Sequence, residues 1–396
     1  MPLELLFNEK KKRIRLRSKD EMESLTRTYY GKIENGELFL SPEEAMYLID
    51  IRNARMFDEA GNELSFNDVS ERLLRDLKEK EKKKFLTRYH TYKDWRERGL
   101  IIRPIEEAEE RYKRNPVVKY PSKEFVPEKY NLDGVFFDDS MLTVSDNEIG
   151  KEIYEKYWIG QYGSYKAAGR GKLLKLDPFE TFFMMKYSGL KIRNKTESEI
   201  IRVFEKSEYH RALYDVYEDW RLRGFILKTG FKFGTHFRVY FPGAAPSATG
   251  KGKKSEWAHS KHVIHVFPRP KRMIIAEWAR AIRVAHSVRK TFILAIPGEV
   301  TKKTKVKLDY LLYHRKKDGI ETPKTDEPSY VMLSLNEDEE IGGAELADTI
   351  EKGKDLGLDV MLAIADRETA VTYYHVKRID IPGSKYKYYE MEWSQP

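Results

Sequence analysis

The sequence predicts an α/β protein of α+β units, in which an N-terminal α/β module and a C-terminal module with a central mixed sheet flanked by helices are repeated along the chain. Two internal repeats and a globular composition lead to this prediction, with 40% hydrophobic, 35% charged and 13% aromatic residues. At 396 residues the chain is too long for one compact core and long enough for two or three domains.

The first repeat joins the N-terminal region to the middle of the chain. Residues 92–101 read YKDWRERGLI and residues 217–226 read YEDWRLRGFI, with seven identities in ten columns at an offset of 125. Upstream of each copy, Ser41 or Asp177 precedes a proline, the pattern of a helix N-cap followed by proline at the first helical position. We therefore expect residues 1–104 and about 134–230 to be two copies of one α/β module.

The second repeat joins the middle of the chain to its end. Residues 276–296 and 344–364 share seven identities in 21 columns at an offset of 68. In both copies a helical spacing of apolar residues gives way to a short apolar run, FILAI or VMLAI, and then to a further strand, VKLDYLLYH or TAVTYYHVKRI. Runs this apolar are typical of strands covered on both faces, so the sheet should be a central layer.

These repeats and two proline-containing polar segments predict the domain organisation. Only the middle unit carries both modules. The expected division is a truncated N-terminal-type unit at 1–104, a linker at 105–133, a complete unit at 134–318 with modules 134–230 and 231–318, a linker at 319–328, and a C-terminal structural unit at 329–396.

The charge is unevenly distributed, although the net charge is only +9. Residues 251–290 hold eleven Lys or Arg and two Glu, whereas residues 326–368 hold thirteen acids and three bases. The basic block favours a polyanion such as nucleic acid, and the acidic block favours docking onto a basic surface.

Other classes of protein are disfavoured by what the sequence lacks. The absence of cysteine argues against disulfide scaffolds, thiol catalysis and cysteine zinc sites. No apolar run approaches the roughly 20 residues needed to span a membrane, and the first residues have the wrong charge order for a signal peptide. We therefore expect a cytoplasmic protein.

Three residues of the middle unit have the chemistry for RNA cleavage by the RNA's own 2′-hydroxyl: Tyr240, His259 and Lys290. Such a reaction needs a base, an acid and a fixed cation, but no metal. Each residue alone has an ordinary structural explanation. In the C-terminal unit, however, the corresponding columns hold Leu358 for Lys290, Glu351 for Arg283 and Glu327 for His259, so that unit resembles an inactive copy.

The stretch KTGFKFGTHFRVY, the following His-Ser-Lys and the stretch RVAHSVRKTFILAI strongly resemble the archaeal tRNA-splicing endonucleases and the catalytic subunit of the eukaryotic enzyme. The arrangement of units resembles the three-unit homodimeric form. The resemblance implies cleavage of precursor tRNA at bulge–helix–bulge motifs, with 2′,3′-cyclic phosphate and 5′-hydroxyl ends and no metal or cofactor. It also implies that the nuclease module, 231–318, and its C-terminal copy have a restriction-endonuclease-like fold.

The same resemblance assigns site residues. It implies that Tyr240, His259 and Lys290 are catalytic, that Arg283 is one of two arginines that clamp a bulged base, and that His236 is only a lower-ranked alternative. The second clamping residue falls near 302–307, where no Arg occurs.

Two further segments extend this interpretation. The insertion 244–254 carries Lys251, Lys253 and Lys254, and we expect it to contact RNA phosphates and to broaden the range of accepted intron positions. The loop Ala365–Ala370, with Asp366 and Glu368, resembles the acidic loop through which structural units of the family dock, so these acids should hold the assembly together.

Two alternatives remain open from the residues themselves. The chain could be a non-catalytic RNA-binding scaffold. It could also be a metal-dependent nuclease, which needs clustered carboxylates around its metal. The middle unit offers only scattered acids such as Glu299 and Asp309, and a histidine site at His259, His262 and His265 is weak because His262 should face away from the other two.

Overall fold

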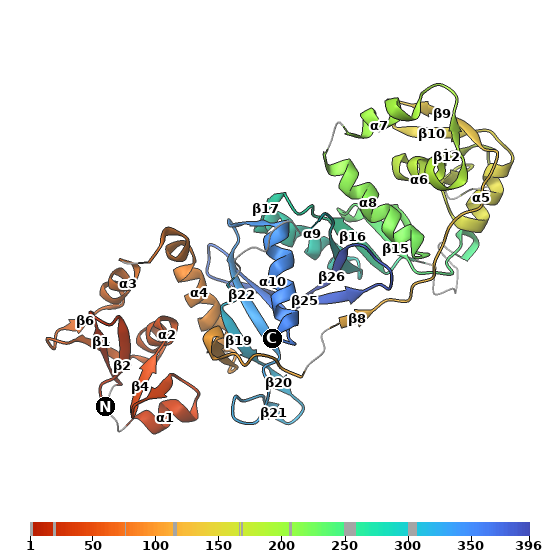
Figure 1. Ribbon diagram of the computed structural model, residues 1–396. Helices are drawn as coiled ribbons and strands as arrows, with labels where there is room; N and C mark the ends of the chain where they lie inside the picture. Colours follow the sequence, from red (N-terminus) through yellow and green to blue (C-terminus); the bar gives the residue numbers. More distant parts are fainter. Residues whose placement is uncertain are drawn as a thin grey trace.

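The computed structural model describes residues 3–18, 21–75, 77–113, 117–165, 167, 169–205, 208–248, 259–299 and 307–396. Two small α/β modules lie at opposite ends of the molecule, and a long central sheet lies between them (Figure 1). The predicted mixed α/β class is confirmed. None of the helices in the described ranges is long and apolar enough to cross a membrane.

The first module has a sheet of order β3-β4-β2-β1-β5-β6, with helices against it. Its helix α2 begins with a capping box, in which the Ser41 side chain accepts from the Glu44 N–H and the Glu44 side chain accepts from the Ser41 N–H. The elements are β1 Glu4–Asn8, β2 Arg13–Leu16, α1 Met22–Arg27, β3 Lys32–Glu34, β4 Glu37–Leu40, α2 Pro42–Arg52, β5 Arg55–Asp58, β6 Glu63–Leu64, α3 Phe66–Leu74 and α4 Glu79–Glu97.

The second module repeats this topology with the sheet order β11-β12-β10-β9-β13. In both modules the first strand pairs antiparallel with the second and parallel with a strand that follows a capped helix. Asp177 and Glu180 form the matching capping box. The elements are β9 Asp133–Phe137, β10 Leu142–Ser145, α5 Ile149–Tyr157, β11 Gln161–Tyr162, β12 Leu174–Leu176, α6 Pro178–Ser188, β13 Lys191–Ile192, α7 Glu197–Glu205 and α8 Glu208–Leu222.

The central sheet has the order β14-β15-β16-β18-β26-β25-β24-β22-β19-β7, and β8 pairs with β25 beside this path. Its strands are β7 Ile101–Pro104, β8 Val117–Lys119, β14 Ile226–Thr229, β15 Phe237–Tyr240, β16 His262–Val266, β18 Thr291–Ile296, β19 Tyr310–Tyr313, β22 Tyr330–Asn336, β24 Asp359–Ala365, β25 Val371–Asp380 and β26 Lys387–Ser394. Helices α9 Ile275–Ser287 and α10 Gly343–Asp355 cover it, the short strands β17 Arg272–Ile274 and β23 Glu340–Gly342 pair beside them, and β20 Arg315–Lys316 pairs with β21 Gly319–Ile320.

The central sheet has two matching arms on either side of β26 and β25. We call β14-β15-β16-β18 the middle arm and β7-β19-β22-β24 the terminal arm. In both arms the inner pair is parallel and the outer two pairs are antiparallel. Tyr240 lies opposite Ile226 in the middle arm, and Tyr313 lies opposite Ile101 in the terminal arm.

Strand pairing therefore differs from the sequence interpretation at one place. VKLDYLLYH was expected to continue the first copy as TAVTYYHVKRI continues the second, but β19 pairs with β22 and β7, whereas β25 pairs with β24 and β26. A boundary that follows pairing would fall before Tyr310 rather than after Asp318. The expected linker 105–133 also contains β8 and the buried Tyr112 and Tyr120. The division into domains otherwise stays a prediction.

Each arm is buried on both faces, as the apolar runs predict. One face of the terminal arm packs against the first module, and one face of the middle arm packs against the second module. The other face of both arms contributes to a core shared with α9 and α10. The two modules thus pack against equivalent faces of the two arms.

Candidate active site

The sheet topology brings three distant segments of the chain to one edge. Strand β15 ends at Tyr240, and its antiparallel neighbour β16 starts just after Ser260. Strand β18 runs parallel to β16 and starts just after Lys290, since His262 pairs with Thr291. The end of β15 and the starts of β16 and β18 therefore lie together, although they are 50 residues apart in the sequence.

Lys290 is held in place by Ser260. Its Nζ donates to the Ser260 carbonyl oxygen and, at 3.1 Å, to the Ser260 Oγ. Nζ also lies 4.6 Å from the ring centroid of Phe233, a cation–π contact. Burial lowers the pKa of Lys290, and the positive charge of Arg238 lowers it further. The ammonium is thus positioned by neutral groups, which leave its charge available to an anion.

Tyr240 lies beside this lysine at the end of β15. Its side chain is buried, and its ring centroid lies 4.6 Å from that of Trp158, which comes from the second module. Burial raises the pKa of Tyr240, while the Arg238 charge and hydrogen bonding with Ser260 oppose the rise. Ser260 therefore connects the tyrosine and the lysine.

His259 and Arg283 are both exposed, but the described electrostatic interaction of Arg283 is with Tyr374 on β25 rather than with the site residues. His259 directly precedes Ser260, and its side chain is exposed to solvent. Arg283 is exposed on α9, the helix that leads to Lys290. Lys251, Lys253 and Lys254 lie outside the described residues, as do residues 302–306, where a second clamping residue was expected.

His236, the lower-ranked alternative for the catalytic role, has contacts that are typical of a structural residue. Its Nδ1 accepts the Val266 N–H at 2.9 Å, and its ring packs against those of Tyr209 and His265. Burial, with the neighbouring His265, lowers the pKa of His236 to about 3, so the ring is neutral. His236 therefore aligns the start of β15 with the end of β16.

The weak histidine metal site is not assembled. Burial lowers the pKa values of both His262 and His265 to about 4, and the His262 ring stacks on Phe241. Of the acids considered, Asp309 is paired with Arg88 at 3.4 Å in the terminal arm. Among the residues with described positions, no group of three His, Asp or Glu side chains could hold a metal ion.

Comparison with known proteins assigns the chain to a family. Residues 7–69 match the family model of the tRNA intron endonuclease N-terminal domain, and residues 210–307 match that of the catalytic C-terminal domain. The tRNA-splicing endonuclease of Methanopyrus kandleri is 31% identical over 159 residues, which are 39% of this chain and 81% of the relative. The chain belongs to the tRNA intron endonuclease family.

Other relatives agree with this assignment. The tRNA-splicing endonuclease of Thermococcus gammatolerans is 31% identical over 160 residues, 38% of this chain and 88% of the relative. That of Methanococcoides burtonii is 33% identical over 189 residues, and the match covers 46% of this chain and half of the relative. The recognition made from the sequence is confirmed, and the protein is an endonuclease. The catalytic-domain match contains Tyr240, His259 and Lys290.

Some side chains of this endonuclease site were not predicted from the sequence. Ser260 and Arg238 lie inside the recognised motifs, but only strand alternation and pairing show that they face Tyr240 and Lys290. Trp158 comes from another module and has no local signal. It takes a left-handed conformation, with φ +49°, at the end of α5, which is the local geometry that presents its ring to Tyr240.

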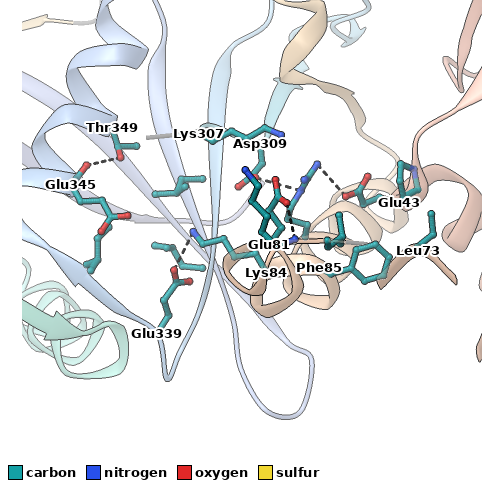
Figure 2. Close-up of a pocket in the computed structure, with 17 residues that line it drawn as sticks. Glu43, Leu73, Glu81, Lys84, Phe85, Lys307, Asp309, Glu339, Glu345 and Thr349 are labelled. Carbon is teal, nitrogen blue, oxygen red and sulfur yellow. Dashed lines mark hydrogen bonds and ion pairs between the residues drawn. The ribbon is translucent and has the colours of Figure 1, made fainter. Parts of the chain in front are cut away.

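A cavity of about 410 Å³ lies elsewhere, between the first module and the terminal arm (Figure 2). Ion pairs join its walls, from Arg88 to Glu43 at 3.1 Å and from Lys84 to Glu339 at 3.1 Å. It contains none of the candidate catalytic residues. Three cations of its lining, Lys84, Arg88 and Lys307, are held in ion pairs.

Proposed function

We propose that this endonuclease cleaves precursor tRNA at bulge–helix–bulge motifs by metal-independent transesterification, with 2′,3′-cyclic phosphate and 5′-hydroxyl ends. One observation carries the proposal: Lys290 and Tyr240 meet at one sheet edge through Ser260, beside the exposed His259. A phenol, an imidazole and an ammonium are the base, acid and charge-stabilising groups that this reaction needs.

The roles follow from the chemistry of each group. Tyr240 takes the proton of the RNA 2′-hydroxyl while the 2′-oxygen attacks the adjacent phosphorus. His259 donates a proton to the 5′-oxygen as the P–O5′ bond breaks. Lys290 stabilises the extra negative charge on the phosphorane-like transition state. Positioning by Ser260 matters because a preorganised cation needs no rearrangement during the reaction.

Substrate binding and assembly complete the proposal. Arg283 stacks on a bulged base, because a guanidinium plane is suited to stacking on an unpaired base. Lys251, Lys253 and Lys254 contact RNA phosphates. Two chains form a homodimer, and Asp366 and Glu368 dock onto a basic surface of another unit, so that two sites cut the two bulges of one motif.

The deciding experiment is cleavage of a labelled bulge–helix–bulge RNA in excess EDTA, with analysis of the ends. Wild type should give cyclic-phosphate ends, and His259→Ala and Tyr240→Phe should each lower the rate by about 10²- to 10⁴-fold, as expected for lost proton transfer. Tyr313→Phe is the matched control, since Tyr313 holds the equivalent position in the terminal arm.

Three other outcomes would contradict the proposal. Cleavage that requires an added divalent metal would support the metal-dependent nuclease. RNA binding without cleavage under any condition would support the scaffold. Equal losses in Tyr240→Phe and Tyr313→Phe would mean that Tyr240 has no special role.

A further inference from the structure

We propose that Arg238 is a positioning residue of this site, whose guanidinium acts on Tyr240 and Lys290 by supplying a fixed positive charge beside both. The inference rests on the proposed function, because it adds a residue to the same reaction. It concerns a residue that lies within the FRVY stretch and that the sequence did not single out.

Strand geometry places Arg238 beside Tyr240. The two residues are separated by one position on β15, so their side chains lie on the same face of the sheet. The Arg238 Cζ lies 5.9 Å from the centroid of the Tyr240 ring. Arg238 is half-buried, and its Nε is buried without a hydrogen-bond partner in the described part of the chain.

The charge of Arg238 is not neutralised by a carboxylate among the described residues. Its cross-strand neighbour Lys228, by contrast, has an ion-pair partner. Lys228 lies opposite Arg238, and it pairs with the buried Glu180 at 2.6 Å. One of two adjacent cations is therefore paired, while the other has no ion-pair partner in the described ranges and faces the active-site edge.

The positive charge of Arg238 acts on both catalytic groups, but it favours the charged form of Tyr240 and the neutral form of Lys290. A positive charge favours a tyrosinate and disfavours a neighbouring ammonium. Accordingly, Arg238 lowers the pKa of Tyr240 against the effect of burial, and it lowers the pKa of Lys290 in addition to the effect of burial. Tyr154, on α5, is a third group whose pKa Arg238 lowers against burial.

Among the main causes of the shift in the pKa of Tyr240, the positive charge is that of Arg238. Lys290 is also held at this edge by Ser260. Tyr165 raises the pKa of Tyr240, and hydrogen bonding with Ser260 lowers it without carrying charge. The nearby Lys228 is matched by Glu180, and His259 is exposed to solvent. Arg238 thus has a specific role in making a buried phenol usable as a base.

The test is the pH dependence of single-turnover cleavage with Arg238 retained, with Arg238→Met and with Arg238→Lys. All three proteins carry His259→Ala, which removes the proton loss of the proposed acid, so that the rising limb reports the phenol of Tyr240 and the falling limb the ammonium of Lys290. In Arg238→Met both limbs should move to higher pH, by about 1 unit, because one group loses an opposite charge and the other loses a like charge. Arg238→Lys should restore both limbs.

A uniform fall in rate at every pH, with both limbs unmoved, would overturn the proposal and leave Arg238 as a structural or phosphate-binding residue. A second measurement keeps this inference separate from the proposed function. The near-ultraviolet absorbance of tyrosinate, as the difference between each protein and its Tyr240→Phe derivative, reports the ionisation of Tyr240 without RNA. The midpoint should rise in Arg238→Met, and an unchanged midpoint would overturn the inference even if cleavage proceeds as proposed.

Discussion

Two oxygen atoms of Ser260 hold the Lys290 ammonium. One belongs to the backbone and the other to the side chain. The Ser260 carbonyl is present whatever the side chain, whereas the Oγ contact at 3.1 Å is not. Ser260→Ala should therefore loosen the lysine without releasing it. A hydrogen bond to a charged group contributes about 1.5–3 kcal/mol, which corresponds to a loss of about 10- to 100-fold in the cleavage rate.

Single-turnover rates would measure this effect. Lys290→Met is the comparison, because it removes the charge itself and should lower the rate further than Ser260→Ala does. Ser260→Thr, which keeps a hydroxyl, should retain most of the activity. A Ser260→Ala enzyme as impaired as Lys290→Met would contradict the assignment of the charge to the lysine.

Buried histidines on the middle arm predict how stability depends on pH. Burial lowers the pKa of His262 from 6.5 to about 4. Its neutral form is therefore favoured in the folded state, while the unfolded chain takes up a proton below its ordinary pKa. The contribution is fully present above about pH 6.5 and is lost as the pH falls towards 4.

The fall in melting temperature between pH 7 and pH 5 should therefore be smaller for His262→Phe than for wild type. Thermal unfolding of each protein at both pH values measures this fall. Phe suits this position because the His262 ring already stacks on Phe241. His286→Phe changes an exposed histidine on α9 and is the control. If wild type and His262→Phe lose stability in parallel, the acid sensitivity arises elsewhere.

At the scale of elements, a buried glutamate of each small module forms an ion pair with a strand of the central sheet. Glu44 accepts the N–H of Gly31 at 2.9 Å and pairs with Arg103 on β7 at 3.0 Å. Glu180 accepts the N–H of Gly160 at 2.8 Å and pairs with Lys228 on β14 at 2.6 Å. Both glutamates are almost fully buried, and both also complete the capping box of their helix.

This duplication gives a matched pair of variants. Glu180→Gln removes the ion-pair partner of the buried Lys228 and should lower the free energy of unfolding by about 3–5 kcal/mol, whereas Glu44→Gln should cost less because Arg103 keeps its ion pair with Glu107 at 2.6 Å. Only Glu180→Gln should also lower cleavage below the unfolding temperature, because Lys228 lies opposite Arg238 in the active-site arm. Urea unfolding and cleavage at a permissive temperature test both statements, and equal losses of cleavage in the two variants would contradict the second.

The sequence predicted the repeated modules and the apolar strands because each depends on local spacing. The capping pairs at Ser41 and Asp177 were likewise visible as an N-cap followed by proline. The partner of β19 was not, because strand pairing is decided by distant residues and VKLDYLLYH reads equally well as a neighbour of either arm. The contact of Trp158 with Tyr240 was missed for the same reason.

At the scale of the whole molecule, the terminal arm has its own chain over the edge that corresponds to the active-site edge. In the terminal arm the segment after β7 crosses this edge: the Tyr112 N–H donates to the Leu356 carbonyl at 2.8 Å, and the Lys113 N–H donates to Glu327 at 3.2 Å. Tyr112 and Tyr313 are both buried there. The terminal arm thus keeps the tyrosine, but it lacks the lysine and is covered by its own chain.

The acidic loop between β24 and β25 is the last feature that the assembly model needs. Asp366 is a poor probe of docking, because it accepts the N–H groups of Glu368 and Ala370, each at 2.9 Å, and so holds the loop in shape. Glu368 is exposed. Charge reversal at Glu368 therefore changes the surface with little effect on the loop.

If the loop docks onto a basic surface of another unit, Glu368→Lys should shift the dimer towards monomer in sizing experiments and lower cleavage to the same extent. Glu368→Gln should have an intermediate effect, since it removes the attraction without adding repulsion. Asp355→Lys, at the exposed end of α10 in the same acidic region, controls for net charge and should leave both measurements unchanged. A Glu368→Lys protein that stays dimeric and active would mean that the two active sites are held at their spacing by another surface.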